Sequence, residues 1–591
     1  MLKKFFLNIL SSFVGAWLAI VLILIGIGIL IISIVGSIAS KESKGLSKKS
    51  VLKISLMGTI VENEVSPQLD MGALLTGKIE QPQTLQGLLA SLEKAKINNN
   101  INAVYIECNG ADAAPATLNA LREGIKDFKS SGKRVFAYGD NFSMGDFYVA
   151  TAADEVYLNP MGSLNLQGIN GTSLYFKDLL DKIGVDVQTV RVGSFKSAIE
   201  PYTSNEMSEA AHTQLDSLYT EMWTYIVDNI SKDTKTSTET IDSLVNNFIY
   251  LDKAEISKKY HLVSDTKYYR QILEIIANYV GTEMEDINFV SPQLLVDNTY
   301  YNTGASNQIA VLYAVGEIGE FENAGINCHK LVPLIVQLAN DENVKGLVLR
   351  VNSPGGSVFG SDQIGEALDY FKSKGKPLAV SMGDYAASGG YWISAGGDII
   401  FADPLTITGS IGIFGMVPNI GQLADKLGIH PQTVGTNPQV MFPSIFYPMT
   451  SQQEAHLQAS IDRGYNQFIN RVASGRGKSV EYIKSIAEGR VWNAIKAKEL
   501  GLVDKLGGLN DAVNWISNKT EIDNYSVVYY PTPEVSWLNM IMTPVAESTE
   551  VKEVVDKMST PDFDQRLMLF TSWFLSLEPM QARCPYYKLS F

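Results

Sequence analysis

The chain has 591 residues, of which 46% are hydrophobic and 19% are charged. Its length exceeds what one compact core holds, and its apolar content excludes a disordered chain, so several folded domains are expected. Its 63 acidic and 48 basic side chains give a net charge of −15, which argues against nucleic acid as a partner, and its three cysteines and five histidines lack metal-site spacing, so neither a metal nor another cofactor is expected.

The first 40 residues differ in kind from the rest. No charged residue lies between Phe5 and Ser40, and residues 13–35 are almost entirely apolar. As a helix, that apolar stretch would span about 34 Å at about 1.5 Å per residue, which is enough to cross the hydrocarbon core of a membrane. The sequence therefore predicts an N-terminal membrane anchor over residues 1–40, with a helix over about 9–36.

A cleaved signal peptide is the alternative to an anchor, because Ser37-Ile38-Ala39 resembles a cleavage site. The apolar run is about twice as long as that of a usual signal peptide, which favours the anchor. The orientation stays open, because the count of flanking lysines would keep the large C-terminal part in the cytoplasm. These lysines are Lys3 and Lys4 before the apolar stretch, and Lys41, Lys44, Lys48 and Lys49 after it.

The remainder of the chain contains an internal repeat. Residues 133–169 resemble residues 376–413, and from Gly139 and Gly383 onward the two segments align without a gap at an offset of 244. A period of that length is too long for a solenoid and indicates duplication of a whole domain.

Each copy alternates short apolar, β-branched runs with amphipathic helices. Residues 346–352 and 377–383 are typical of buried strands, and residues 118–132 and 363–375 are typical of helices that end at a glycine. This alternation predicts an α/β fold with parallel strands. The predicted organisation after the anchor is a linker over 41–54, a first copy over 55–281, an inter-copy link over 282–307, a second copy over 308–534 and an unassigned tail over 535–591.

The chemistry is expected where the copies differ. The second copy has Ser388 between Ala386-Ala387 and Gly389-Gly390, whereas the first copy has Met144 at the serine position. A serine among such small residues sits on a tight turn that a peptide backbone can approach, as a nucleophile requires. The alternative is an ordinary serine at the start of a helix, where it would cap the backbone.

A second pair of glycines favours the nucleophile. Gly355 and Gly356 end the motif N-S-P-G-G at a strand-to-helix turn, whereas the first copy has the degenerate N-G-A-D-A. Backbone amides of these glycines, together with the amide of Gly389, would form an oxyanion hole.

A nucleophilic serine needs a base, and the chain has no G-x-S-x-G elbow. His430 lies in a strand-like segment, 429–434, and His456 lies in a polar helix, so both are interpreted as surface or structural residues. Lysine is the other candidate base. Lys196 follows an apolar strand in the first copy and aligns with Val440 in the second, although a solvated lysine is the usual alternative.

Five motifs occur in this order along the chain: RVGSFKSAIEPYTSNEMS, RVNSPGGSV, GDYAASGGYWISA, TGSIGIFG and GRVWNAIKAKELGLVDKLGG. Together they resemble the long, duplicated form of the signal peptide peptidase A family, whose members are membrane-anchored serine proteases with a Ser–Lys dyad. The resemblance covers roughly residues 10–520.

The resemblance implies a tandem crotonase/Clp-like α/β fold and a homo-oligomer, typically a tetramer, around a bowl-shaped cavity. It implies Ser388 as the nucleophile, Lys196 as the general base and Ser410 as the residue that holds the lysine. It also implies an inner-membrane protein with its catalytic part on the periplasmic side, which cleaves signal peptides and other apolar peptides. The apolar loop over 439–449 is consistent with such substrates, and core or oligomer contact is its alternative.

For Lys196 to act as a base near neutral pH, its pKa must fall from about 10.4 to about 7–8, a shift that burial in an apolar site can supply. Two other functions stay in view: a crotonase-type acyl-CoA enzyme, which would need carboxylates at the cleft, and a catalytically silent membrane scaffold. The pair of Ser388 and Lys196 argues against both.

Overall fold

The computed structural model describes most of the two predicted copies. The described residues are 46–63, 83–296, 305–321, 324–437, 439–531 and, for the backbone alone, 581–583. The predicted anchor over residues 1–40 lies outside them. Within the part of the chain that is described, no helix is long and apolar enough to cross a membrane.

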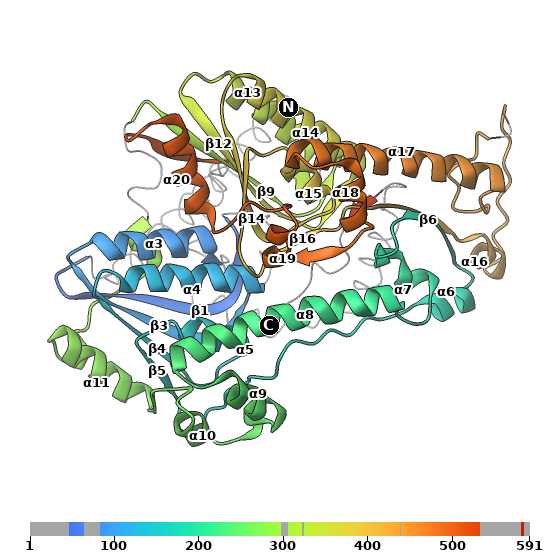
Figure 1. Ribbon diagram of the computed structural model, residues 1–591. Coiled ribbons are helices and arrows are strands. Elements are labelled where there is room, and N and C mark those ends of the chain that lie inside the picture. Colours follow the sequence, from blue (N-terminus) through green and yellow to red (C-terminus); the bar gives the residue numbers. More distant parts are fainter. Residues whose placement is uncertain are drawn as a thin grey trace, which may run out of the picture. The chain divides into compact units, whose positions relative to one another are not determined.

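Two parallel sheets with the same strand order confirm the duplication. Figure 1 shows the two sheets with the helices around them. The strands of the first sheet are, in spatial order, β8 (Phe289–Val290), β1 (Ser50–Val61), β3 (Ile101–Asp112), β4 (Arg134–Gly139), β5 (Glu155–Leu158) and β7 (Asp265–Thr266). Their counterparts are β20 (Ser526–Tyr530), β9 (Gln308–Val315), β12 (Val344–Ser353), β14 (Leu378–Ala387), β15 (Ile399–Ala402) and β19 (Lys505–Leu506). Each strand therefore meets the same neighbour in both copies.

Short strands extend both sheets. In the first, β2 (Gln83–Thr84) runs parallel to β1. In the second, β16 (Ile407–Gly409) runs parallel to the end of β14, and β18 (Val491–Asn493) runs antiparallel to β16. The addition of β16 matters for the site, because it places the residues that follow Gly409 beside the end of β14.

Helices cover both faces of each sheet, as parallel sheets require. The predicted helices are confirmed as α4 (Pro115–Lys129) and α14 (Val358–Ser373). In the first copy α3 (Leu85–Ile97) and α4 pack in the main core on one face, and α11 (Tyr269–Val280) packs on the other. In the second copy α13 (Cys328–Asn340) and α14 take the first role and α20 (Leu509–Thr520) the second.

The two copies share a third sheet. Strand β6 (Asp186–Val192) of the first copy pairs antiparallel with β17 (Ile413–Asn419) of the second, with Val192 opposite Ile413 and Asp186 opposite Asn419. The sheet continues through β21 (Gln581–Arg583), β13 (Gly355–Ser357), β10 (Ile318–Gly319) and β11 (Ile326–Asn327).

This pairing is asymmetric with respect to the repeat. Residues 430–436, which correspond to β6 at the offset of 244, form no strand, and neither do residues 169–175, which correspond to β17. The prediction of a strand over 429–434 is therefore wrong. The reason is that a strand needs a partner, and β17 is already occupied by β6.

Buried carboxylates of the second copy bind the start of helix α4 in the first. Asp384 accepts hydrogen bonds from the Thr117 amide and hydroxyl, both at 2.8 Å, and Asp403 accepts one from the Asn119 amide group at 2.7 Å. A carboxylate at a helix N-terminus satisfies amides that lack intrahelical partners. Desolvation raises the pKa of Asp384 and raises that of Asp403 to about 7.

A second buried contact lies beside the first. Glu62 at the end of β1 forms an ion pair with Arg350 on β12 at 2.8 Å, and Asn352 donates to both Glu62, at 3.1 Å, and Asp384, at 2.9 Å. These bonds form one network between β1 of the first copy and β12 and β14 of the second, so the strand that ends at Ala387 is held against the other copy.

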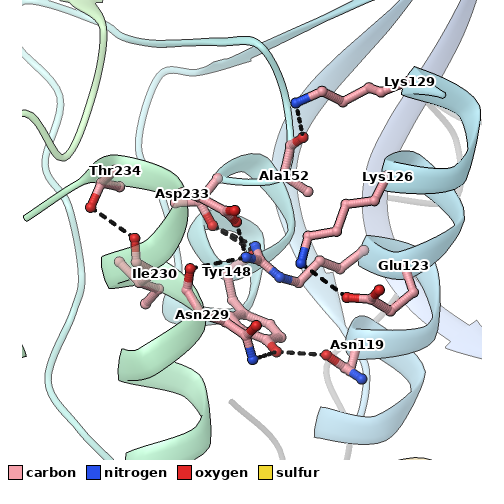
Figure 2. A network of polar contacts seen from close by, with 12 residues as sticks. Asn119, Glu123, Lys126, Lys129, Tyr148, Ala152, Asn229, Ile230, Asp233 and Thr234 are labelled. Carbon is pink, nitrogen blue, oxygen red and sulfur yellow. Dashed lines mark hydrogen bonds and ion pairs between the residues drawn. The ribbon is translucent and has the colours of Figure 1, made fainter. Parts of the chain in front are cut away.

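A further network holds the first copy together internally. Figure 2 shows Asn119 of α4, Tyr148 of α5 (Met144–Ala150) and Asn229 of α8 (Glu209–Thr234) joined by hydrogen bonds. The buried guanidinium of Arg122 lies within this group and binds Asp233, also on α8. Helix α8 in turn reaches the second copy, where Gln214 accepts a bond from the Val491 amide at 2.8 Å.

Candidate active site

Ser388 occupies the sharp turn between β14 and the short helix α15 (Gly389–Ser394). Its backbone has φ 56° and ψ −117°, a conformation that favours glycine, and its amide donates to the Gly409 carbonyl at 2.8 Å. The turn is tight: a Cβ on Gly390 would lie 2.7 Å from the Ser353 carbonyl oxygen. The side chain of Ser388 makes no capping hydrogen bond to α15, so the helix-cap alternative does not describe it.

The side chain of Ser388 faces Lys196 instead. Lys196 lies four residues beyond the end of β6, and its Nζ lies 2.8 Å from Ser388 Oγ. Both side chains are fully buried, so the solvated-lysine alternative does not apply. Burial of an amine disfavours its charged form.

Ser410 completes the surroundings of the amine. It follows β16 and precedes β17, and its Oγ and carbonyl oxygen lie 3.1 Å and 3.2 Å from Lys196 Nζ. Ser410 is also fully buried and has a positive φ of 52°. Two hydroxyls and one carbonyl thus orient the lysine amine between them.

The predicted oxyanion-hole glycines lie at the same edge. Gly389 begins α15, where first-turn amides lack intrahelical partners. Gly355 and Gly356 both have positive φ, 106° and 149°, and a Cβ on Gly356 would lie 2.0 Å from the Ile318 carbonyl oxygen, so only glycine fits there. The Gly355 amide is engaged already, because it donates to Ser353 Oγ at 3.2 Å.

His430 and His456, the two histidines considered as bases for Ser388, both lie on the surface. His430 is exposed, with Nδ1 3.3 Å from Asp425 Oδ1, and His456 is exposed on α17 (Ser451–Arg476). The sequence interpretation of both as surface residues is confirmed.

The corresponding place in the first copy is closed. Met144, which aligns with Ser388, packs in the hydrophobic core. Two residues later, the buried Asp146 carboxylate accepts bonds from the amides of Gly110 and Ala111 at 3.0 Å and 3.2 Å, and desolvation raises its pKa. In the first copy, the Asp146 carboxylate therefore binds two backbone amides of the segment that corresponds to N-S-P-G-G.

Sequence reasoning missed two features of the site. Strand β21 of the tail runs antiparallel to β13, with Arg583 opposite Gly355, and a three-residue strand leaves no recognisable pattern. The loop Glu488–Arg490 lies against the Lys196 segment, and its only signal was Gly489 within the GRVWNA motif.

Comparison with family models matches both copies. Residues 127–282 and 370–523 match the model of Peptidase family S49, and residues 322–404 match that of Clp protease. These matches support a Clp-protease-like α/β fold with a duplicated family S49 domain.

Whole-length relatives carry protease names. The chain is 32% identical over 580 residues to Protease 4 of Haemophilus influenzae, covering 92% of each chain. It is 32% identical over 555 residues to Protease 4 of Salmonella typhi, covering 91% of this chain and 88% of that one. It is 25% identical over 486 residues to "Serine protease SPPA, chloroplastic" of Arabidopsis thaliana, covering 80% and 70%.

The backbone of Ser388 yields a stability prediction. We expect Ser388→Gly to have a free energy of unfolding about 1 kcal/mol higher than Ser388→Ala, because both lose the hydroxyl and only glycine relieves the positive φ. Denaturant titration of the purified variants measures the difference. At Ser394 on α15 the order should reverse, by about 0.5–1 kcal/mol, because glycine weakens a helix. A less stable glycine variant at position 388 would contradict a strained nucleophile turn.

Proposed function

Because this chain belongs to peptidase family S49 and is a serine peptidase, we propose that it hydrolyses peptide bonds with Ser388 as nucleophile and Lys196 as general base. The observation that carries the proposal is the 2.8 Å approach of Lys196 Nζ to Ser388 Oγ in a fully buried site. We assign the base to the first copy, residues 55–281, and the nucleophile to the second, residues 308–534.

The proposed reaction begins with proton transfer. The neutral amine of Lys196 takes the proton of Ser388 as Oγ attacks the scissile carbonyl carbon. The carbonyl π electrons move to oxygen, and the amides of Gly356 and Gly389 stabilise the oxyanion. The Gly355 amide would contribute only if its hydrogen bond to Ser353 Oγ broke. The lysine ammonium then protonates the leaving amine, which gives an acyl-enzyme.

Deacylation repeats these roles with water. Lys196 takes a proton from water as the hydroxide adds to the ester carbon, and Ser388 leaves with the proton returned by the lysine. Burial keeps the amine uncharged between steps, and Ser410 holds it in line by two contacts. No metal or other cofactor has a part in these steps.

The position of β21 supports an extended peptide as substrate. This segment of the chain's own tail lies between β13 and β17, antiparallel to the strand that carries Gly355 and Gly356. Strand addition of this kind binds a peptide through its backbone and leaves side-chain pockets to set preference. A substrate peptide would take the same place beside Ser388.

We further propose that the substrates are signal peptides and other apolar peptides near a membrane. The apolar stretch in residues 1–40 would anchor the chain in the bacterial inner membrane, with the catalytic part on the periplasmic side. Long domains can be translocated despite flanking lysines, so the lysine count does not exclude the proposed orientation.

The loop over 439–449 fits either an apolar substrate or a second copy of the chain. Phe442 and Met449 pack against the core of the second copy, whereas Val440, Ile445 and Tyr447 are exposed. We propose a homo-oligomer, with four chains as the resemblance implies. Analytical ultracentrifugation, which measures the mass of the particle in solution, tests the number of chains.

Substitution of the dyad tests the catalytic proposal. Ser388→Ala and Lys196→Ala should each lower the rate of peptide hydrolysis at least about 10³-fold, and the double variant should lose little more, because the two groups act as one unit. Lys196→Arg should be equally inactive, since guanidinium keeps its proton. Cleavage of a fluorogenic peptide and labelling by a fluorophosphonate probe measure these losses.

The outcome for Lys196→Ala decides the identity of the base. Full activity in that variant, or a wild-type rate that rises only near pH 10, would remove the lysine from the mechanism. Met144→Ser serves as a control, because it restores a serine in the first copy and should create no labelled site there.

Location is tested from outside the cell membrane. Protease added to intact spheroplasts should cleave exposed loops of the folded part, because that part faces the periplasm in the proposed orientation. Immunoblotting for residues beyond 46 follows the cleavage. Cleavage only after permeabilisation would place the catalytic part in the cytoplasm, as the lysine count alone would have it.

Substrate preference is tested with peptides of equal length. Apolar peptides should be cleaved with a higher kcat/KM than polar ones, because apolar surface leaves water on binding, while folded proteins should be cleaved slowly or not at all. Progress curves under identical detergent conditions give the two rates. Equal rates would refute the substrate class while leaving the dyad untouched.

A further inference from the structure

One loop of the second copy contacts both the segment that carries Lys196 and Ser410, which lies beside the lysine amine. The Glu488 carbonyl accepts a hydrogen bond from the Phe195 amide at 2.9 Å, immediately before Lys196. Two residues further, the Arg490 carbonyl accepts one from the Ser410 amide at 2.7 Å, and between them the Gly489 amide donates to the Ile411 carbonyl at 2.9 Å. We call residues 488–490 the 488–490 loop.

Three glycines allow the backbones to meet at this point. A Cβ on Gly489 would lie 2.8 Å from both the backbone nitrogen and the Cβ of Lys196. One on Gly193 would lie 2.5 Å from the Glu488 carbonyl oxygen, and one on Gly412 would lie 2.9 Å from Gly489 Cα. The backbones of the segments that carry the lysine, Ser410 and the 488–490 loop therefore approach one another closely at these three glycines.

Side chains of the 488–490 loop also contact the two residues that precede Lys196. The Glu488 carboxylate accepts bonds from the Ser194 amide at 3.1 Å and from its hydroxyl at 3.2 Å. The guanidinium of Arg490 lies over the ring of Phe195 at 5.1 Å and over that of Trp492 at 4.2 Å. Phe195 is thus held on its backbone and on its ring by the same loop.

We propose that the 488–490 loop positions Lys196, by setting the distance from the amine to Ser388 and to Ser410 together. The inference rests on the proposed function, since it matters only if the lysine is the base. Glu488, Gly489 and Arg490 are positioning residues, because they bond the segments that carry Lys196 and Ser410 and would act on the reaction only through them.

The contacts of the 488–490 loop show how it can set the position of the Lys196 amine. Lys196 reaches Ser388 from another copy of the domain, so no local turn of either copy fixes their separation. The loop bonds one residue before Lys196 and bonds Ser410 itself, and the Gly409 carbonyl accepts a hydrogen bond from the Ser388 amide, so a shift of the loop at Lys196 moves the amine relative to both hydroxyls. A displacement of about 1 Å at such a site can cost about 10²-fold in rate.

Gly489→Ala in the full-length protein tests the proposal, with Gly375→Ala as a matched control. Both glycines have φ +76°, so both variants carry the same backbone strain. A Cβ at 375 meets nothing within 4 Å, whereas one at 489 displaces Lys196. We expect kcat to fall about 10²-fold in Gly489→Ala, with KM unchanged, and Gly375→Ala to keep the wild-type kcat.

The pH profile separates positioning from a general structural effect. Moving the amine out of its buried site eases its protonation, so the pH of half-maximal kcat should rise in Gly489→Ala and stay in place in Gly375→Ala. Equal kcat in the two variants, or a lower kcat with an unchanged pH profile, would overturn the proposal.

Ser194→Ala decides the matter if Gly489→Ala fails to fold. Ser194 is exposed, and the alanine variant removes one of the two hydrogen bonds that Ser194 donates to the Glu488 carboxylate, the one from its hydroxyl. We expect a fall in kcat of roughly threefold to tenfold with the same upward pH shift, whereas Ser130→Ala, which removes an exposed hydroxyl bond far along the chain, should show neither. Identical behaviour of the two serine variants would refute the positioning role.

Lys196→Ala, assayed in parallel, distinguishes a failure of the proposed base from a failure of the positioning role. If it retains activity, the proposed base is wrong and the positioning role falls with it. If it is inactive while Gly489→Ala is fully active, the dyad stands and only the role of the 488–490 loop is refuted.

Discussion

The antiparallel pairing of β6 with β17 is the interaction on which the site depends. It joins a strand of the first copy to a strand of the second, from Val192 opposite Ile413 to Asp186 opposite Asn419. Lys196 follows one end of this ladder by four residues and Ser410 precedes it by three, so both arrive at the end of β14. Backbone hydrogen bonds thereby place an amine beside a serine that lies 192 residues away in the chain.

The ladder is supported by buried polar bonds that cross between the copies. The carboxylates of Asp384 and Asp403 bind the start of α4, and Glu62 binds Arg350. Burying such groups costs desolvation free energy, so their main effect is on specificity. An arrangement of the copies that leaves any of them without its hydrogen-bond partner is disfavoured. Asp384 lies four residues before Ser388 on β14, which links this geometry to the nucleophile.

The asymmetry of the duplication follows from the same constraint. Once β6 pairs with β17, the corresponding segments at 430–436 and 169–175 have no such partner and form no strand. The first copy keeps the lysine, but its serine position holds Met144 and Asp146 binds the amides of the adjacent loop. The pairing therefore draws the candidate site from both copies, and the first copy carries the proposed base.

Periodicity and repeated motifs are local properties of the chain, and from them the duplication, the α/β class and the helices over 118–132 and 363–375 could be predicted correctly. The motifs also singled out Ser388, Lys196 and Ser410 as candidates for the roles proposed above. The predicted strand over 429–434 was wrong, and no pattern pointed to β21 or to the 488–490 loop. The 2.8 Å distance from the lysine to the serine and the bond from the Gly355 amide to Ser353 could not be predicted, since both depend on how separate segments pack. Strand pairing and backbone contact between residues hundreds of positions apart leave no pattern in either segment alone.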